Sequence, residues 1–132
     1  MLRLGLALLA AFHLVWGLPA IVAPHWFFDH FPGAGHRWTA AYQPYNEHLM
    51  TDVGAAAFTL GVLLAIAAVM ADRRVTNVVL IGVLVFSALH LGYHTARHGT
   101  LSGGDLLASL VSLVAGVLFP AFLLWLNRRR NT

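Results

Sequence analysis

The chain has 132 residues, of which 59% are hydrophobic and 10% are charged, and its formal net charge is +3. A soluble domain of this size has about a quarter of its residues charged, so the composition indicates an integral membrane protein and argues against a soluble enzyme. The chain has no cysteine, which excludes disulfides, thiolate metal sites and cysteine nucleophiles.

Four apolar segments are each long enough to cross a bilayer, because a hydrocarbon core of about 30 Å requires about 20 helical residues. They cover approximately residues 4–22, 48–71, 75–94 and 106–126. We therefore predict an all-α, polytopic membrane protein that forms a single bundle of four transmembrane helices. The first segment also has features of a signal peptide, but His13, Trp16 and Pro19 fit that interpretation poorly, so we expect this helix to be retained.

The extracytoplasmic loop expected at residues 23–45 is rich in aromatic side chains. They are Trp26, Phe27, Phe28, Phe31, Trp38, Tyr42 and Tyr45. Aromatic residues concentrate where lipid headgroups meet acyl tails, so we expect a short interfacial helix followed by a turn at "PGAG", folded against the bundle. Two roles stay open for this loop: an interfacial anchor, or a lid over a site or a lipid-access path.

The arginines predict the orientation of the bundle. Six of them flank one side of the predicted helices, namely Arg3, Arg73, Arg74, Arg128, Arg129 and Arg130, whereas only Arg37 and Arg97 fall on the other side. By the positive-inside rule, we expect both termini to face the cytoplasm. A cysteine at Gly35 is then expected to label from outside, and one at Asn131 is not. No nucleic-acid partner is expected.

Two pairs of ionisable residues have the spacing of one helical turn. His48 and Asp52 are four residues apart at the start of the second segment, and His90 and His94 are four apart at the end of the third. Only "DRR" separates the two segments, which predicts an antiparallel hairpin that brings the pairs together. We expect these four residues to bind one divalent metal ion, Zn, Fe or Cu, with the main risk that His48 projects one turn beyond His94.

Other polar residues flank this predicted metal site. Glu47 is a candidate catalytic base, although an acidic group at a helix start is also favoured by the helix dipole. His13, His98 and Asp105 are expected near the site, as hydrogen-bond partners of the metal ligands, as alternative ligands, or in purely structural roles. Two alternatives to the metal stay open, a His–Asp hydrogen-bond network without metal and, less favoured, haem held by His13 and His90.

Small residues recur every four positions in two of the helices. The second segment has Ala57, Gly61 and Ala65, and the fourth has Ala108, Ser112 and Gly116. This spacing lets helices approach closely in lipid, where hydrophobicity gives no drive to associate. GC-rich coding, which favours Ala and Gly, explains the same pattern without any helix contact, and both explanations stay open. A compact bundle is expected in either case.

The pattern "PYNEH" followed by Asp52 and Gly54, with a histidine pair ending the next helix, resembles an uncharacterised family of small four-helix bacterial membrane proteins. "FPG" in the first loop and "YNEHLMTDVG" are the most recognisable parts, and the resemblance covers most of the chain. It implies this architecture and a location in a bacterial cytoplasmic membrane, and it implies no particular activity.

Two functional hypotheses follow, and enzymatic activity is left open. The first is a membrane metalloprotein whose His/Asp site opens to the extracytoplasmic side and acts on a lipid-like or small substrate. The second is a non-enzymatic accessory subunit, or a lipid-binding helical bundle, of a larger membrane complex. The expected partners are the bilayer itself and either further copies of the chain or such a complex.

Overall fold

The computed structural model describes residues 1–129, and four of its α-helices are long and apolar enough to cross a membrane. These are α1 (Leu2–Val22), α3 (Glu47–Met70), α4 (Arg73–Ala96) and α5 (Gly103–Arg129). The connection between α1 and α3 holds α2 (Pro24–His30), the two-residue strands β1 (Pro32–Gly33) and β2 (His36–Arg37), and the 3-10 helix η1 (Thr39–Ala41). The predicted all-α four-helix bundle is confirmed, with helix bounds that differ from the expected ones by a few residues.

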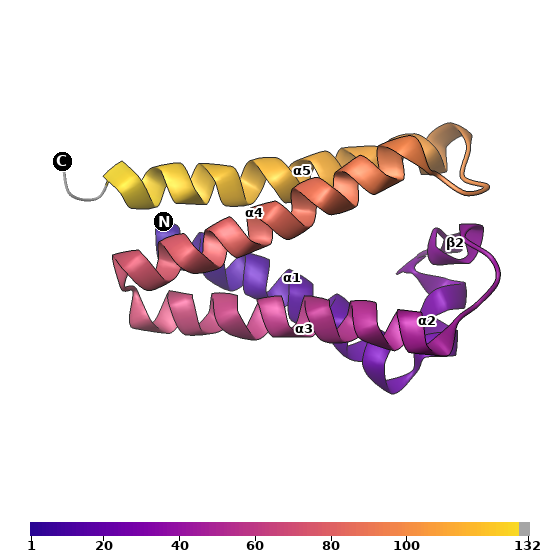
Figure 1. Ribbon diagram of the computed structural model, residues 1–132, viewed down its shortest axis with the longest axis horizontal. Helices are drawn as coiled ribbons and strands as arrows, with labels where there is room; N and C mark the ends of the chain where they lie inside the picture. The colour runs from indigo at the N-terminus through magenta and orange to yellow at the C-terminus, as the bar shows by residue number, and fades with distance from the viewer. Residues whose placement is uncertain (130–132) are drawn as a thin grey trace.

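The bundle has two distinct ends, shown in Figure 1. The start of α1, the end of α5 and the turn between α3 and α4 lie at one end, which we call the terminal end. The connection from α1 to α3 and the turn from α4 to α5 lie at the other, which we call the loop end. Residues 130–132, including the Asn131 position considered above, lie outside the described residues.

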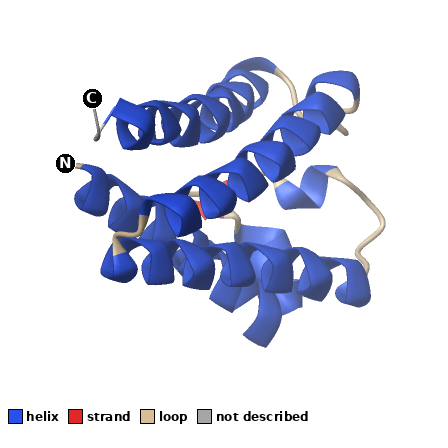
Figure 2. Ribbon diagram, turned by 60° about the vertical axis from the view of Figure 1, so that its left-hand side comes forward, coloured by secondary structure: helices blue, strands red, loops and turns tan. Residues whose placement is uncertain are grey.

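The four long helices associate as two pairs, α1 with α3 and α4 with α5 (Figures 1 and 2). Glycines on α3 permit the first contact, because a Cβ on Gly54 would stand 2.8 Å from the Cβ of Ala20, and one on Gly61 would stand 2.8 Å from Leu14. Such close approach maximises dispersion contacts where lipid supplies no hydrophobic drive. The expected role of small residues in the second segment is thus confirmed at Gly61.

The corresponding prediction for the fourth segment is wrong. Ala108 and Ser112 are exposed, and a Cβ added to Gly116 would meet no atom within 4 Å. The α4–α5 contact instead includes a polar link near the terminal end. Asn127 is fully buried, and its amide donates to the carbonyl of Arg73 and to Asn77, each at 3.0 Å.

The two helix pairs share one core, and it lies toward the terminal end. Leu6, Leu64, Leu80 and Leu123 are its largest buried side chains, one from each long helix. The α3–α4 turn is tight there, because Ala71 ends α3 at a φ of 52° and the Asp72 carboxylate caps α4. From this shared core the two helix pairs separate toward the loop end, as Figure 1 shows.

Candidate functional site

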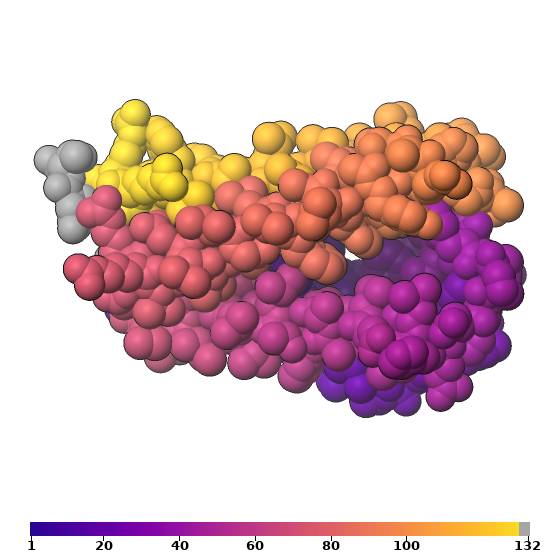
Figure 3. All heavy atoms as spheres, in the orientation of Figure 1, coloured from indigo at the N-terminus to yellow at the C-terminus, as the bar shows by residue number. Residues whose placement is uncertain are grey.

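The face of α4 that packs into the shared core is fully buried only along the first half of the helix. Thr76 and Val83 are completely buried and lie seven residues apart, on one helix face. The same spacing leads to His90, which is only partly buried. Figure 3 shows a hollow between α3 and α4 on the loop-end side of the core.

The facing helices change in the same way at this level. On α3, Ala67 is completely buried, whereas Val53, fourteen residues earlier on the same face, is 40% exposed. On α5, Leu123 packs against Gly5 of α1, but Gly116, two turns nearer the loop end on that face, opens onto empty space. We call the hollow between α3 and α4 the outer chamber. By helix periodicity, Val53, His90, His94 and Gly116 lie on the inward faces of their helices at this level.

The two histidines of the outer chamber form a linked group. The rings of His90 and His94 lie 4.5 Å apart between centroids, and His90 stacks on Phe86 at 5.6 Å. The Nδ1 atom of His94 shares a hydrogen bond with the hydroxyl of Tyr42, at 2.5 Å, and this hydroxyl also donates to the carbonyl of Arg97 at 3.3 Å. Whichever tautomer His94 adopts, its Nε2 atom is left to contact a bound molecule.

Burial raises the pKa of Tyr42 above its ordinary value, and the nearby phenol of Tyr93 adds to this effect. Tyr42 therefore stays neutral at physiological pH and acts as a hydrogen-bonding group. Because Tyr42 lies in the connection between α1 and α3, its hydrogen bond with His94 joins this connection to α4.

His13 reaches the interior from α1. It lies seven residues after Leu6, which is completely buried, and so occupies the same helix face two turns nearer the loop end. Its Nδ1 atom bonds to the carbonyl of Leu9 at 2.8 Å, which leaves Nε2 as the atom that can contact a bound molecule.

The connection between α1 and α3 is folded onto the bundle, as its aromatic content predicted. Its main anchor is Asp105 at the start of α5, which accepts from Trp38 Nε1 at 3.1 Å and pairs with His36 Nδ1 at 2.6 Å. A second contact joins η1 to the α4–α5 turn, where the amide of Thr100 donates to the carbonyl of Ala41 at 3.1 Å. Gly99 permits this approach, because a Cβ there would stand 2.3 Å from the same carbonyl oxygen.

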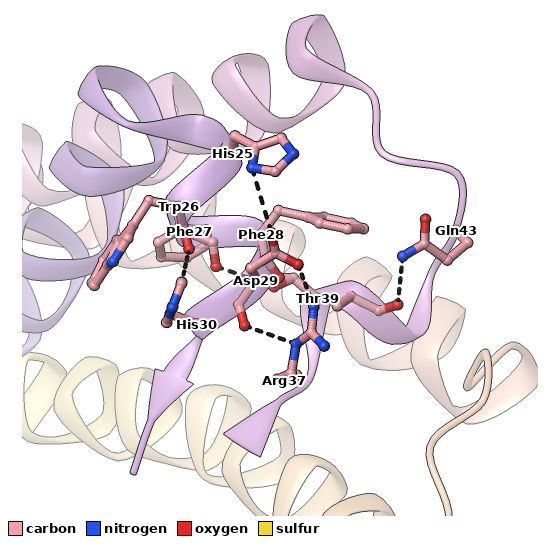
Figure 4. A network of polar contacts seen from close by, with 10 residues as sticks. His25, Trp26, Phe27, Phe28, Asp29, His30, Arg37, Thr39 and Gln43 are labelled. Carbon is pink, nitrogen blue, oxygen red and sulfur yellow. Dashed lines mark hydrogen bonds and ion pairs between the residues drawn. The ribbon is translucent and has the colours of Figure 1, made fainter. Parts of the chain in front are cut away.

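Polar contacts also hold this connection together internally (Figure 4). Asp29 forms an ion pair with Arg37, and His25 lies 3.4 Å from the same carboxylate. The hydroxyl of Thr39 donates to the carbonyl of Phe28 at 2.6 Å. Asp105, predicted as an alternative metal ligand, thus serves as an anchor for this connection.

The expected convergence of His48, Asp52, His90 and His94 is not present in the described chain. His48 Nε2 and Asp52 Oδ2 do lie 3.4 Å apart, but their side chains are 88% and 61% exposed and point away from the face of α3 that contacts α1 and α4. Among residues 1–129, no three His, Asp or Glu side chains are placed to hold one metal ion. The hairpin turn joins the two helices at the terminal end but leaves them separate at the loop end.

The remaining predicted site residues lie outside the outer chamber. Glu47 is exposed in the first turn of α3, where Asn46 caps the helix by accepting from the amide of Leu49 at 2.9 Å. His98 is exposed in the turn after α4. A catalytic role for Glu47, and haem binding by His13 and His90, stay predictions.

Sequence reasoning missed three residues that organise the loop end: His36, Trp38 and Tyr42. The last two were assigned to the interface as aromatics, without partners. No local pattern pairs Tyr42 with His94 or Trp38 with Asp105, because each pair joins segments more than 50 positions apart.

No protein-family model, curated protein or solved structure matches this chain. The resemblance to small four-helix bacterial membrane proteins therefore stays a prediction.

Proposed function

We propose that this protein binds a lipid-like molecule with an uncharged head group in the outer chamber. The observation that carries this proposal is the change of the interior faces of α3, α4 and α5 from buried residues near the terminal end to partly exposed ones near the loop end. Such a space between membrane helices is occupied by an apolar chain more favourably than by water.

The lining of the outer chamber supports an amphiphilic ligand. Val53 offers an apolar wall, and Gly116 leaves room for an acyl or isoprenoid chain. His90 and His94 offer ring nitrogens near the loop end, where a head group would lie. The hollow between α3 and α4 gives a lateral path from the bilayer (Figure 3).

The distribution of charge favours an uncharged head group, such as the hydroxyl of a diacylglycerol. Asp29 and Arg37 pair with each other in the α1–α3 connection, and Asp52 points outward from α3. An ionised head group beside His90 would lack a fixed countercharge at a depth where charge is costly. Arg97, exposed at the end of α4, is the cation that an anionic lipid would meet at the mouth of the chamber.

The proposed setting is a bacterial cytoplasmic membrane, with the loop end outside and both termini in the cytoplasm. The arginine distribution supports this orientation. Ligand would then be bound in the outer leaflet half of the bundle. Metal-dependent catalysis at a single-chain His/Asp site is a less favoured function, since the described chain brings too few ligands together.

Native mass spectrometry of the detergent-purified protein tests the proposal, after incubation with dioleoylglycerol or dioleoylphosphatidylglycerol. We expect one dioleoylglycerol to be retained per chain, in preference to the anionic lipid. A leucine at Gly116 would fill the outer chamber and is expected to reduce retention by about tenfold or more, because a few buried methylene groups of ligand contact are lost. His90→Ala is expected to reduce it by about fivefold, the effect of one hydrogen bond of about 1 kcal/mol.

Gly82→Leu is the matched control. A Cβ at Gly82 also meets no atom within 4 Å, but this glycine lies on an exposed part of α4 near the core level. Equal lipid retention by wild type, Gly82→Leu and Gly116→Leu would overturn the proposed chamber. Preferred retention of phosphatidylglycerol, abolished by Arg97→Gln, would overturn the uncharged head group.

A further inference from the structure

The outward pair on α3 has no part in the outer chamber. Large apolar side chains are exposed elsewhere on the outside of the bundle, such as Leu4 and Val15 on α1 and Leu107 and Val111 on α5, each at least 59% exposed. His48 and Asp52 instead place an imidazole and a carboxylate on the outside of the bundle. Polar groups at this position are costly in lipid unless another group covers them.

The geometry of the pair matches two ligands of one metal ion. Zinc binds histidine nitrogen and aspartate oxygen at about 2.0–2.2 Å, so two ligands at the tetrahedral angle lie about 3.3–3.6 Å apart. His48 Nε2 and Asp52 Oδ2 are 3.4 Å apart. Ligands four residues apart on one helix are a recurring way to bind zinc.

One chain supplies only half of such a site. A closed zinc site takes four ligands, and no third His, Asp or Glu of residues 1–129 joins this pair. We propose that a second copy of the chain docks on this face of α3 and completes a divalent cation site with its own histidine and aspartate. A two-fold axis normal to the membrane relates the copies, so both pairs meet at one depth.

The rest of the face fits a second copy. Ala55 and Thr59 lie on the same side of α3 below the pair, and both are exposed. Their small side chains let the two α3 helices approach closely. Two aspartates brought together in this way repel each other, and a divalent cation between them removes that repulsion. The cation therefore acts as the link between the copies.

Zinc titration of the full-length protein in detergent tests this inference, with calorimetry for stoichiometry and light scattering for mass. We expect one zinc ion per two chains, a doubling of mass with zinc and its reversal by a chelator. Cobalt is expected to give the visible absorption of a tetrahedral site. Asp52→Asn and His48→Gln should each weaken zinc binding by more than about 100-fold. Mutating a residue that only hydrogen-bonds a metal ligand already lowers metal affinity by about 10- to 100-fold.

The double variant His90→Ala/His94→Ala is the control and should keep the zinc-linked dimer. A second readout uses the lack of native cysteine. With diamide added as the oxidant of the two thiols, Thr59→Cys should form a disulfide between copies faster when zinc is present, and Leu118→Cys, exposed on α5, should not. Binding of one zinc per chain, a dimer indifferent to the chelator, or zinc binding lost only in the His90/His94 variant would each overturn the inference.

Discussion

Gly17 of α1 lies so close to α3 that a Cβ atom on it would stand 2.6 Å from the amide nitrogen of Phe58. The obstructing atoms belong to the backbone, which cannot rotate away as a side chain would. This contact holds the first helix pair together at mid-length. It also means that α1 is an integral part of the bundle's packing.

Gly17→Ala is accordingly expected to destabilise the protein by about 1–3 kcal/mol, the range for overpacking a well-packed contact. Gly82→Ala is the matched control, because its new methyl group meets no atom within 4 Å and alanine favours the helix more than glycine does. The stability of both variants is measured by their unfolding in SDS. Equal stability of the two would contradict the close α1–α3 contact.

Asn127→Ala is expected to destabilise the terminal end. Its buried amide bonds to the carbonyl of Arg73 and to Asn77, and the substitution leaves both acceptors without this donor. Hydrogen bonds between membrane helices contribute about 0.6 kcal/mol on average and up to about 1.7 kcal/mol, so we expect a loss of about 1 kcal/mol in SDS unfolding. Asn77→Ala, which removes only one of the two acceptors, should have the smaller effect.

The four long helices were predictable because apolar length is a strong signal in a membrane protein. The neighbouring partners within one helix were predictable as well, since a spacing of four places His48 beside Asp52 and His90 beside His94. Both adjacencies are confirmed.

The rotation of α3 about its own axis was not predicted. Every face of such a helix is apolar enough for lipid, so hydrophobicity does not tell which face is inside. Gly54 and Gly61, seven residues apart, mark the contact face in the structure. Asp52 falls on the other side of the helix, and the metal site expected within one chain required the opposite rotation.

The separation of the helix pairs at the loop end also escaped prediction. A short turn fixes two helices where they join, but helices of 24 residues extend for about 36 Å beyond it and diverge when each has a different partner. Here α3 follows α1 and α4 follows α5. The outer chamber results from this pairing of the helices.

Membrane orientation can be measured with two introduced cysteines, since the chain has none of its own. Ala34 is a better outer position than Gly35. Its φ of 53° lies in the left-handed region that residues with a side chain can adopt, whereas the φ of 85° at Gly35 tolerates a side chain less well. We expect Ala34→Cys to react with a membrane-impermeant maleimide in intact cells and Arg74→Cys to react only after permeabilisation. The reverse pattern would contradict the proposed orientation.

Asp105→Asn is expected to loosen the connection between α1 and α3. The carboxylate accepts from Trp38 and pairs with His36, and the amide keeps the shape while removing the charge. Because His36 and Asp105 are 49% and 41% exposed, water screens their attraction, and we expect a loss of about 1 kcal/mol. Faster proteolysis between Gly33 and Arg37, with unchanged helix content, would show that the connection is loosened. Glu47→Gln, which removes an exposed carboxylate elsewhere, serves as the control and should not change the rate of proteolysis.

Tyr42→Phe tests the bond that links the α1–α3 connection to His94. Burial raises the pKa of Tyr42 above 10.0 in the folded protein, so its neutral form is favoured by folding. The stability that this contributes is fully present below pH 10.0, and it is lost as pH rises through the folded pKa, because the unfolded phenol ionises first. We expect the free energy of unfolding in SDS to be about 1 kcal/mol higher for wild type than for Tyr42→Phe. This difference should be constant from about pH 8 to pH 9.5 and smaller above about pH 10. A difference that grew above pH 10 would mean that the folded protein favours the ionised phenol, which the burial of Tyr42 does not allow.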